Sequence, residues 1–338
     1  MKAVKSSNKR RGRNITIGTV IGFLLSCTAV AGADEYLYIK DDNGIQFNTG
    51  GEWNNANPYK DAGNIWDKET NTYVNNIALS GMNNGGSGAV YGVKLEVNSE
   101  GVKFINNGAI SAESTSSNAY GIDNVTGSKI SLINNGTISS TAALSHTQYK
   151  AGYGIYLDKG QGSTGSVTNT GVIYGNDSAI YIETADSSGT INNYGVLVSD
   201  NKNVINEKGN DISGNNYGIK YKTVGGSSAV IAGDSTSVEI LVEHEVKRTM
   251  DIKNLEDGGF KNTYTNTILN SLKDTYRVEG DTNSVTGSII NAYETAIVYD
   301  AENGGNLTLS GTVVNGGAKK DTDTISGSDN GDTLILQA

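Results

Sequence analysis

The chain has 338 residues, with 44 glycines, a single proline, 36% hydrophobic residues and 7% aromatic residues. This composition is poor in the side chains that fill a thick globular core, so one long repetitive domain is favoured over two ordinary ones. The single cysteine, Cys27, excludes an internal disulfide and a zinc site built from cysteines. The net charge of −10 argues against nucleic acid as a partner, because an anionic surface repels it.

Residues 1–31 have the plan of a secretory signal peptide. A basic segment precedes an apolar stretch from about Ile15 to Cys27, and small residues follow it. Cleavage is expected after Ala31 or Ala33. We therefore predict that residues 1–31 are a signal peptide and that the mature protein is exported.

The same segment also fits a second kind of export signal. The letters LLSC, which end at Cys27, match the loose pattern of a lipoprotein signal, in which the cysteine is acylated and becomes the new N-terminus. The conventional cleavage site AVA, which ends at Ala31, favours ordinary signal peptide removal.

Residues 34–82 show only a weak repeat and contain both tryptophans, Trp53 and Trp66. A stack of repeated β-units needs a terminal segment that shields the strand edges of its first unit. We therefore predict an N-terminal cap over residues 34–82.

Two phrases alternate through residues 83–238, and the second recurs once at residue 296. The first phrase, seen in INNGAI, INNGTI, TNTGVI and INNYGVL, places a glycine one or two residues after an asparagine; these glycines are Gly108, Gly136, Gly171 and Gly195. The second phrase supplies one central aliphatic residue per copy: Val93, Ile122, Ile155, Ile180, Ile219 and Ile297. The unit is 25 to 39 residues long, a period that signals a solenoid or a propeller.

The units have no apolar pattern of helical period and lack the Trp-Asp signature of propeller blades. We therefore predict an all-β fold, a right-handed parallel β-helix (solenoid), with coils over residues 83–238 and further, incomplete coils over 285–338. Each strand should pair with its equivalent one coil away, ~4.8 Å distant, with Ile130, Leu132 and Ile138 directed inward. The glycines should provide positive φ at the corners, and stacked asparagine amides should bond along the axis.

The repeat lapses between Glu239 and Ser284. We predict an irregular insertion or loop over residues 239–284, with a short helix from about Thr267 to Tyr276. A loop of this kind either carries a function or is simply a tolerated insertion.

With these features in place, the chain resembles the N-terminal passenger part of an autotransporter (type V secretion), most like the large surface autotransporters of fusobacteria. RNITIGTVIGFLLSCTAVAGA looks like the signal region of that group, and the four Asn-Gly phrases look like its passenger repeats. The resemblance spans nearly the whole chain, but its motifs are diffuse, so it implies an architecture more than an activity.

The resemblance implies a place at the outer membrane or cell surface for a full autotransporter, and in the periplasm or medium otherwise. It implies host-cell or bacterial surface proteins or glycans as partners. Proteins of this family end in a translocator barrel, whereas this chain ends in GSDNGDTLILQA within the repeat pattern. We therefore expect either a piece of a longer protein or a truncated product, with the outer membrane reached only through a translocator absent from this chain.

Three patterns approach functional motifs without completing them. Gly233-Asp234-Ser235-Thr236 lacks the glycine that follows a protease serine, and only His146 and His244 are available as a base. The acidic pairs lack the basic partners of a sugar-acid lyase site: Asp41 with Asp42, and Asp321 with Asp323. GSDNGDTLI (327–335) resembles one calcium-binding nonapeptide, but a single copy cannot complete the coordination and reads as an acidic corner.

We therefore predict no catalytic, cofactor-binding or metal-binding residues and no cofactor. The leading hypothesis is a non-enzymatic surface passenger, a β-helical stalk or adhesin segment. The alternative hypothesis is a β-helix carbohydrate-active enzyme or a protease passenger.

Overall fold

The structure is a computed structural model that describes residues 16–17, 24–26, 36–41, 44–49, 52–83, 88–97, 101–125, 130–143, 150–157, 164–183, 188–207, 212–225, 228–241, 246–300, 302, 304–319, 322–328 and 332–337. The predicted all-β class is confirmed. Strands dominate the described residues, and the one helical element among them is the 3-10 helix η1 (Lys60–Ala62). No helix in this part of the chain is long and apolar enough to cross a bilayer.

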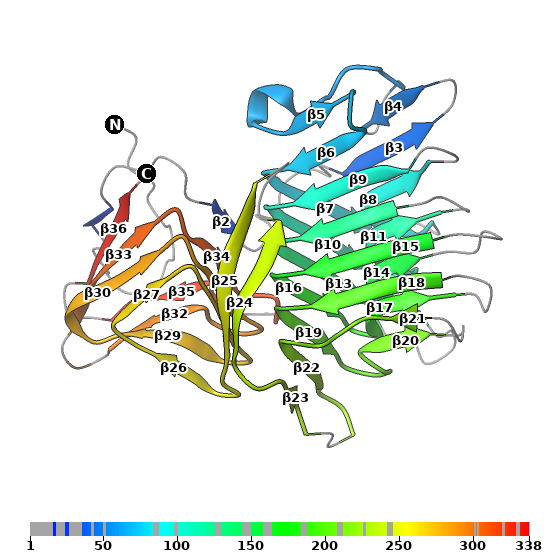
Figure 1. The fold of residues 1–338 in the computed structure, drawn as a ribbon. Helices are drawn as coiled ribbons and strands as arrows, with labels where there is room; N and C mark the ends of the chain where they lie inside the picture. Colours follow the sequence, from blue (N-terminus) through cyan, green and yellow to red (C-terminus); the bar gives the residue numbers. More distant parts are fainter. Residues whose placement is uncertain are drawn as a thin grey trace.

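The described residues between 36 and 231 form three sheets that together make the first stack (Figure 1, blue to yellow-green). Its junction sheet contains β7 (Ala78–Asn83), β10 (Ala109–Ser114), β13 (Thr137–Ala142), β16 (Val172–Gly175), β19 (Val196–Ser199), β22 (Ile219–Lys222) and β23 (Val230–Ile231). Its tyrosine sheet contains β4 (Ile45–Asn48), β3 (Leu37–Asp41), β8 (Val90–Glu96), β11 (Ala119–Asn124), β14 (Gly152–Leu157), β17 (Ser178–Ile182) and β20 (Ile205–Glu207). Its third sheet contains β5 (Ile65–Asp67), β6 (Thr72–Asn75), β9 (Val102–Asn106), β12 (Ile130–Asn134), β15 (Thr164–Asn169), β18 (Ser188–Asn193) and β21 (Ile212–Ser213).

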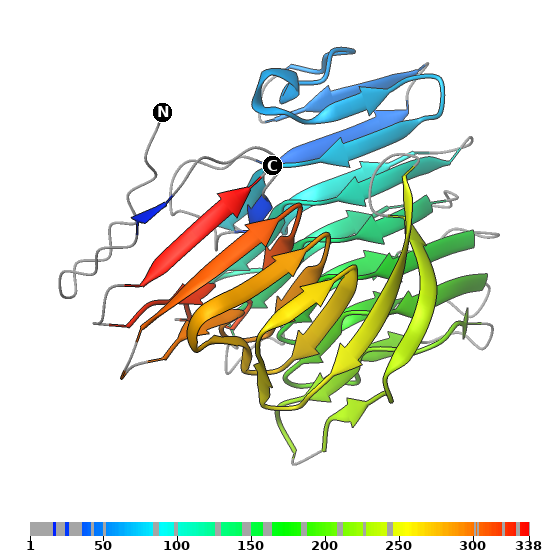
Figure 2. The same cartoon turned by 60° about the vertical axis from the view of Figure 1, so that its left-hand side comes forward.

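Residues 235–337, with two short N-terminal strands, form the second stack (Figure 2, yellow to red). One sheet contains β24 (Ser235–Leu241), β25 (Lys247–Asn254), β28 (Thr267–Ser271), β31 (Ile289–Ala292), β34 (Val313–Asn315) and β2 (Leu24–Ser26). The second sheet contains β27 (Thr263–Thr265), β30 (Gly280–Thr286), β33 (Gly305–Ser310), β36 (Thr333–Gln337) and β1 (Thr16–Ile17). The third sheet contains β26 (Gly258–Phe260), β29 (Asp274–Val278), β32 (Ile297–Tyr299) and β35 (Ile325–Ser326).

Apart from the antiparallel pairs β3–β4, β5–β6, β22–β23 and β24–β25, consecutive strands of the described residues enter different sheets. Strands pair in parallel with their equivalents one circuit later. Ile110, Ile138, Ile173 and Leu197 are directly opposite one another in this register, and all four are buried in one hydrophobic cluster. The inward positions predicted for Ile130, Leu132 and Ile138 are likewise buried. A thin column of aliphatic side chains therefore replaces a broad core, which explains the low hydrophobic content.

Asparagine side chains form a hydrogen-bonded ladder at one corner of the first stack, as predicted. The Nδ2 of each asparagine donates to the Oδ1 of the next one at 2.7 to 2.9 Å, through Asn75, Asn106, Asn134, Asn169, Asn193 and Asn216. These side chains are buried except for Asn216, which is half-buried. Because each buried amide has its partners, the ladder holds the circuits in register at no cost of unsatisfied polar groups.

The corner glycines have a different role from the predicted one. Gly108, Gly136, Gly171 and Gly195 are not among the residues with positive φ. Gly108 lies directly over the backbone of Ile77, and each of the other three lies over the preceding glycine, so that a Cβ on Gly136 would overlap the carbonyl oxygen of Gly108. Glycine is therefore required there because the backbones of neighbouring circuits approach too closely for any side chain.

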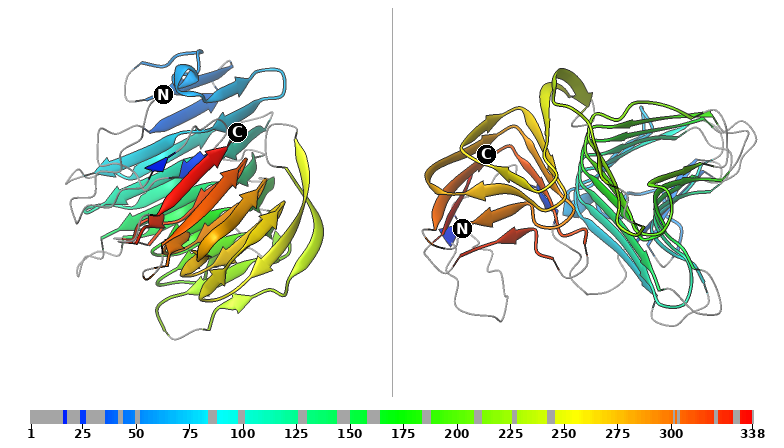
Figure 3. Two further views of the ribbon diagram at one scale, coloured as in Figure 1. Left: turned by 90° about the vertical axis from the view of Figure 1, so that its left-hand side faces the viewer. Right: turned by 90° about the horizontal axis from the view of Figure 1, so that it is seen from below.

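The second stack runs back along the first in the opposite direction. Its own ladder links Asn315, Asn291, Asn270 and Asn254 at 2.8 Å per step. Each of these amides also donates its other hydrogen to a backbone carbonyl of the first stack, in the pairs Asn254 to Tyr217, Asn270 to Tyr194, Asn291 to Thr170 and Asn315 to Asn135. The chain therefore folds back on itself, and the two stacks lie side by side (Figure 3, right).

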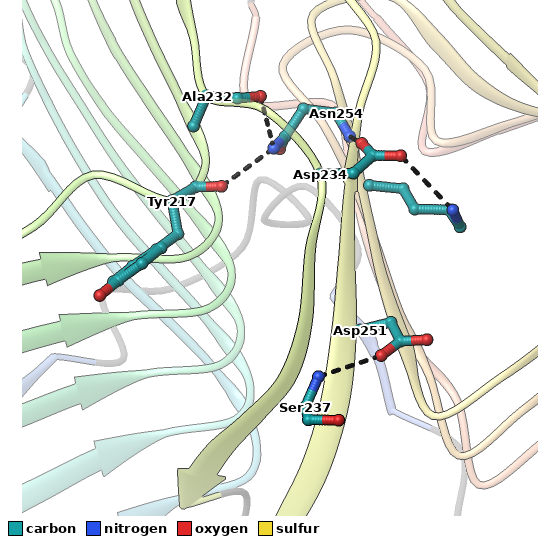
Figure 4. A network of polar contacts seen from close by, with 7 residues as sticks. Tyr217, Ala232, Asp234, Ser237, Asp251 and Asn254 are labelled. Atoms are coloured by element: carbon teal, nitrogen blue, oxygen red, sulfur yellow. Dashed lines mark hydrogen bonds and ion pairs between the residues drawn. The ribbon is translucent and has the colours of Figure 1, made fainter.

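The hairpin β24 to β25 connects the two stacks. Asp234 accepts hydrogen bonds from the backbone N–H of Asn254 at 3.2 Å and from Lys253 Nζ at 3.4 Å, and the Asn254 amide donates to the Ala232 carbonyl at 3.1 Å (Figure 4). These contacts fix the point at which the chain reverses.

The predicted irregular insertion over 239–284 is wrong for the residues that the structure describes. Residues 246–284 form regular strands from β25 onward, and the segment expected to be helical, Thr267 to Tyr276, forms β28 and most of β29. The helix does not form because Ile268, Leu269 and Asn270 match Ile289, Ile290 and Asn291 in parallel register. The corner following Asn270 has no glycine, so the repeat was not recognisable there.

The N-terminal cap is shorter than the predicted 34–82. The antiparallel strands β4 and β5 close two sheets of the first stack, whereas β6 and β7 already pair in parallel with β9 and β10. Phe47 packs against Trp66, with ring centroids 5.5 Å apart. Trp66, one of the two tryptophans predicted for the cap, therefore packs half-buried beside the first circuit.

Candidate binding surface

Six tyrosines lie on the outer face of the tyrosine sheet, and we call this surface the tyrosine face. Five of them are half-buried, and Tyr181 is buried among its neighbours. Strand register puts Tyr91, Tyr120 and Tyr153 opposite one another in one column. A second column contains Tyr38, Lys94, Asp123, Tyr156 and Tyr181. The residues between these columns, Val93, Ile122, Ile155 and Ile180, are fully buried. Each directly precedes a residue of the second column, so strand alternation directs the second column outward. The first column lies two residues before the buried ones, and the glycine between them is skipped in the pairing register, so the regular alternation is interrupted there.

The glycine that follows each tyrosine of the first column is a packing requirement. A Cβ on Gly121 would lie 2.6 Å from Ile138 Cγ2, which belongs to the junction sheet. The Tyr-Gly pair therefore combines an outward ring with a close approach of two sheets behind it.

The rings form a continuous contact chain. Tyr91 stacks on Tyr120, with centroids 5.4 Å apart and an interplanar angle of 11°. Tyr120 meets Tyr156 edge to face at 5.0 Å, and Tyr156 stacks on Tyr181 at 5.3 Å. Such pairs are favourable beyond the area they bury, so the rings hold one another in fixed orientations.

Lysines extend this chain into the cap. The Nζ of Lys94 lies 4.6 Å from the ring centre of Tyr38 and 5.2 Å from that of Tyr91. Lys40 lies 4.3 Å from the ring of Trp53, which in turn meets Tyr38 at 4.7 Å. These cation–π contacts continue the aromatic face to the N-terminal end of the first stack.

Carboxylates lie among the tyrosine hydroxyls. The hydroxyl of Tyr38 donates to Glu96, and that of Tyr156 donates to Glu183. Burial, together with the neighbouring Asp123 and Tyr120, raises the pKa of Tyr91 to about 12. Burial, with Tyr181, Tyr120 and Glu183, also raises the pKa of Tyr153. The hydroxyls of Tyr91 and Tyr153 are therefore neutral at physiological pH and can donate hydrogen bonds.

This arrangement is suited to binding. Rigid aromatic rings with polar tips supply large contact areas at a low entropy cost, and they are enriched where proteins recognise partners. In the part of the chain that the structure describes, no group of three His, Cys, Asp or Glu side chains is placed to hold a metal ion.

Among the residues of the incomplete motifs, those that the structure describes make structural contacts. Asp234 of the Gly-Asp-Ser segment anchors the connecting hairpin, as described above. Ser328, in the nonapeptide-like segment, donates its hydroxyl to Asp332 at 2.7 Å. Asp41 accepts a hydrogen bond from the backbone N–H of Gly44 at 3.1 Å. The predictions that concern Cys27, Ala31, Asp42, His146, His244 and Asp321 fall outside the described residues.

The sequence contained a signal for the tyrosine face that its aliphatic repeat obscured. The Tyr-Gly pair recurs at Tyr91, Tyr120 and Tyr153 in the same register as the buried residues. The sequence repeat places Ile219 in this phrase, but Ile219 pairs with Val196 in the junction sheet, and Ile205 is the residue opposite Ile180. The strand pairing is therefore needed to assign a Tyr-Gly phrase to the tyrosine sheet or to the junction sheet.

Comparisons with protein families, with curated proteins and with solved structures find no match for this chain. The function is therefore argued from the geometry of the described residues alone.

Proposed function

We propose that this chain is a non-enzymatic, exported surface passenger, a stalk and adhesin segment of an autotransporter of the fusobacterial type. In this proposal both stacks are right-handed parallel β-helices. The signal peptide over residues 1–31 directs export, and a translocator of the family type places the protein at the outer membrane and cell surface.

The tyrosine face carries the adhesive part of the proposal. Its rings are stacked, as Tyr91 is on Tyr120 at 5.4 Å. They are held rigidly because the buried aliphatic residues of the same strands fix the strand register. Its partners are host-cell or bacterial surface proteins or glycans, whose polar groups bond to the hydroxyls and carboxylates. The net charge of −10 disfavours nucleic acid as a partner.

The test is a cell-binding assay with the purified full chain. Labelled protein is added to epithelial cells and to bacteria of other species, and bound protein is measured against concentration. The double variant Tyr120→Thr, Tyr153→Thr keeps strand propensity and removes two rings from the face. We expect its binding to fall roughly tenfold, the loss typical of a central contact residue.

The matched control is Tyr264→Thr, because Tyr264 lies in the second stack and is half-buried like Tyr120. It should bind as the unaltered chain does. Equal binding by the double variant would remove the tyrosine face from the proposal, and failure of the unaltered chain to bind any cell would leave only a spacer role.

The rival function is a carbohydrate-active enzyme or a protease built on the same scaffold. Incubation of the full chain with pectin, mucin glycans and casein checks this possibility. Turnover of any of the three would overturn the non-enzymatic proposal.

A further inference from the structure

A pocket of about 410 Å³ lies at the end of the first stack, between its last described circuits. Ile191, Val204 and Ile205 form an apolar wall, and Ser213, Asn215 and Asn216 add polar groups. This volume is in the range of ligand-binding pockets, and the mixture of an apolar wall with a few polar groups is typical of them.

Two lysines line the pocket at positions that are inward-facing in every earlier circuit. Lys220 is opposite Leu197, which is fully buried in the core, and Lys222 is opposite Ser199, which is also fully buried. Both lysines are half-buried. The aliphatic column that runs through the first stack therefore ends in a cation.

The two lysines bring two positive charges to the end of an apolar column. Moving an ammonium group away from water is unfavourable unless an anion compensates it. Within the described part of the chain neither Lys220 nor Lys222 has a carboxylate at ion-pair distance. A terminal circuit does need polar groups as a cap, but outward lysines would serve that purpose without a pocket.

The asparagine ladder of the first stack also ends at this pocket. Every step of the ladder donates toward the later residue, so the donor end of the amide chain is Asn216. Asn216 uses one Nδ2 hydrogen for the Gly218 carbonyl at 3.2 Å, and among the described residues no further asparagine follows to accept the other one. Aligned amides polarise one another, so the terminal N–H is an enhanced donor for an anion.

We propose that this end pocket binds a sugar acid, a pyranose ring that carries a carboxylate. The carboxylate lies against Lys220, Lys222 and the free N–H of Asn216. The hydroxyls of the ring bond to Ser213 and Asn215, and its apolar C–H face packs on Ile191 and Val204. A small anion alone would leave the apolar wall uncovered. The inference does not depend on the tyrosine face or on the cell-binding role.

The experiment compares methyl β-D-glucuronide with methyl β-D-glucoside, which differ only in the carboxylate. Saturation-transfer NMR and titration are carried out on the full chain. We expect the glucuronide to bind at least roughly tenfold more tightly than the glucoside, because charge-assisted hydrogen bonds are lost with the carboxylate. Binding of the glucuronide should also weaken as salt is raised.

Lys220→Gln and Lys222→Gln should each weaken glucuronide binding roughly tenfold. The matched control is Lys273→Gln, because Lys273 is an exposed lysine of the second stack that pairs with Asp257. It should leave binding unchanged. If Lys220→Gln fails to fold, the salt dependence of the unaltered chain and Lys222→Gln still decide the question.

Equal binding of the two glycosides, or unchanged binding by both lysine variants, would overturn the proposal. Displacement of the glucuronide by an equal concentration of inorganic phosphate would overturn the sugar assignment, since the pocket would then recognise any anion. Neither result bears on the cell-binding assay of the tyrosine variants, so the two proposals fail separately.

Discussion

At the scale of single residues, the corners of the first stack depend on two side chains with opposite demands. Asn134 fills its site with an amide that donates to Asn169 and to the Gly136 carbonyl, whereas Gly136 must have no side chain at all. The Asn-Gly pair is therefore a stacking device and not a hairpin turn. The sequence predicted the ladder but assigned the glycine to positive φ, because only the stacked backbones reveal the close approach.

Gly171→Ala tests this role of glycine. A Cβ on Gly171 would overlap the Gly136 carbonyl oxygen, so we expect a loss of about 2–3 kcal/mol of unfolding free energy in urea titrations. Gly165→Ala is the control, because its Cβ would meet Ile130 Cγ2 at 3.6 Å, an ordinary contact. A similar loss in both variants would contradict the stacking explanation.

Asp177 gives the fold a pH dependence. Its side chain is buried, and this burial raises the pKa of the carboxyl, partly offset by Lys202. An acid with a raised folded pKa contributes stability below its unfolded pKa of about 3.9, and this contribution is lost as the pH rises through the folded pKa. Ionised Asp177 therefore destabilises the fold at neutral pH.

We expect Asp177→Asn to raise the urea midpoint at pH 7 and to change it less at pH 4. Asp61→Asn, at an exposed position, should have no such pH-dependent effect. A gain for Asp177→Asn that is the same at both pH values would show that the charge is not responsible.

At the scale of elements, antiparallel strands close the ends of sheets that are otherwise parallel. β4 and β5 cover the N-terminal end of the first stack, and β23 pairs antiparallel with β22 at the other end. Each circuit contacts mainly its neighbours, so the cap and the distant circuits should unfold with different free energies. The sequence predicted a cap from the tryptophans, but it could not place its boundary, because β6 and β7 lack the Asn-Gly phrase.

Phe47→Ala tests the cap. Phe47 is 1% exposed and contacts Tyr73 at 5.7 Å between ring centroids, so its loss should cost about 3–5 kcal/mol. Hydrogen exchange should become faster in β3 to β6 while β31 and β34 of the second stack keep their protection. Ile65→Ala, at a site 50% exposed, should change neither the unfolding free energy nor the hydrogen exchange of β3 to β6. Uniform loss of protection would show that the molecule unfolds as one unit.

At the scale of the whole molecule, the reversal of the chain turns two thin stacks into one wider body. Tyr174 of the first stack meets Tyr293 of the second at 5.3 Å, and Leu272 is buried in the same cluster. Burial raises the pKa of both tyrosines, so both rings are neutral in this interface. The second asparagine ladder adds four donors to backbone carbonyls of the first stack, as described above.

The double variant Leu272→Ser, Tyr293→Ser should separate the stacks. The change removes two buried side chains from the contact, at a cost of about 3–5 kcal/mol for the aromatic ring alone. Small-angle scattering should then give a larger radius of gyration while circular dichroism still reports strands. Leu255→Ser, at a position 43% exposed, should keep the original radius. An unchanged radius in the double variant would mean that the asparagine contacts suffice.

The sequence by itself determined the class of fold, the inward aliphatic positions and the asparagine ladder, because all three depend on strand alternation and on the spacing of a local repeat. It did not determine the reversal of the chain, since that contact joins outer faces as distant as Asn315 and Asn135 and leaves no periodic pattern. The tyrosine face and the end pocket likewise depend on the tertiary structure. The role of a tyrosine or a lysine depends on the side of the sheet that it occupies. The strand register sets that side, and the register is a property of the stacked circuits.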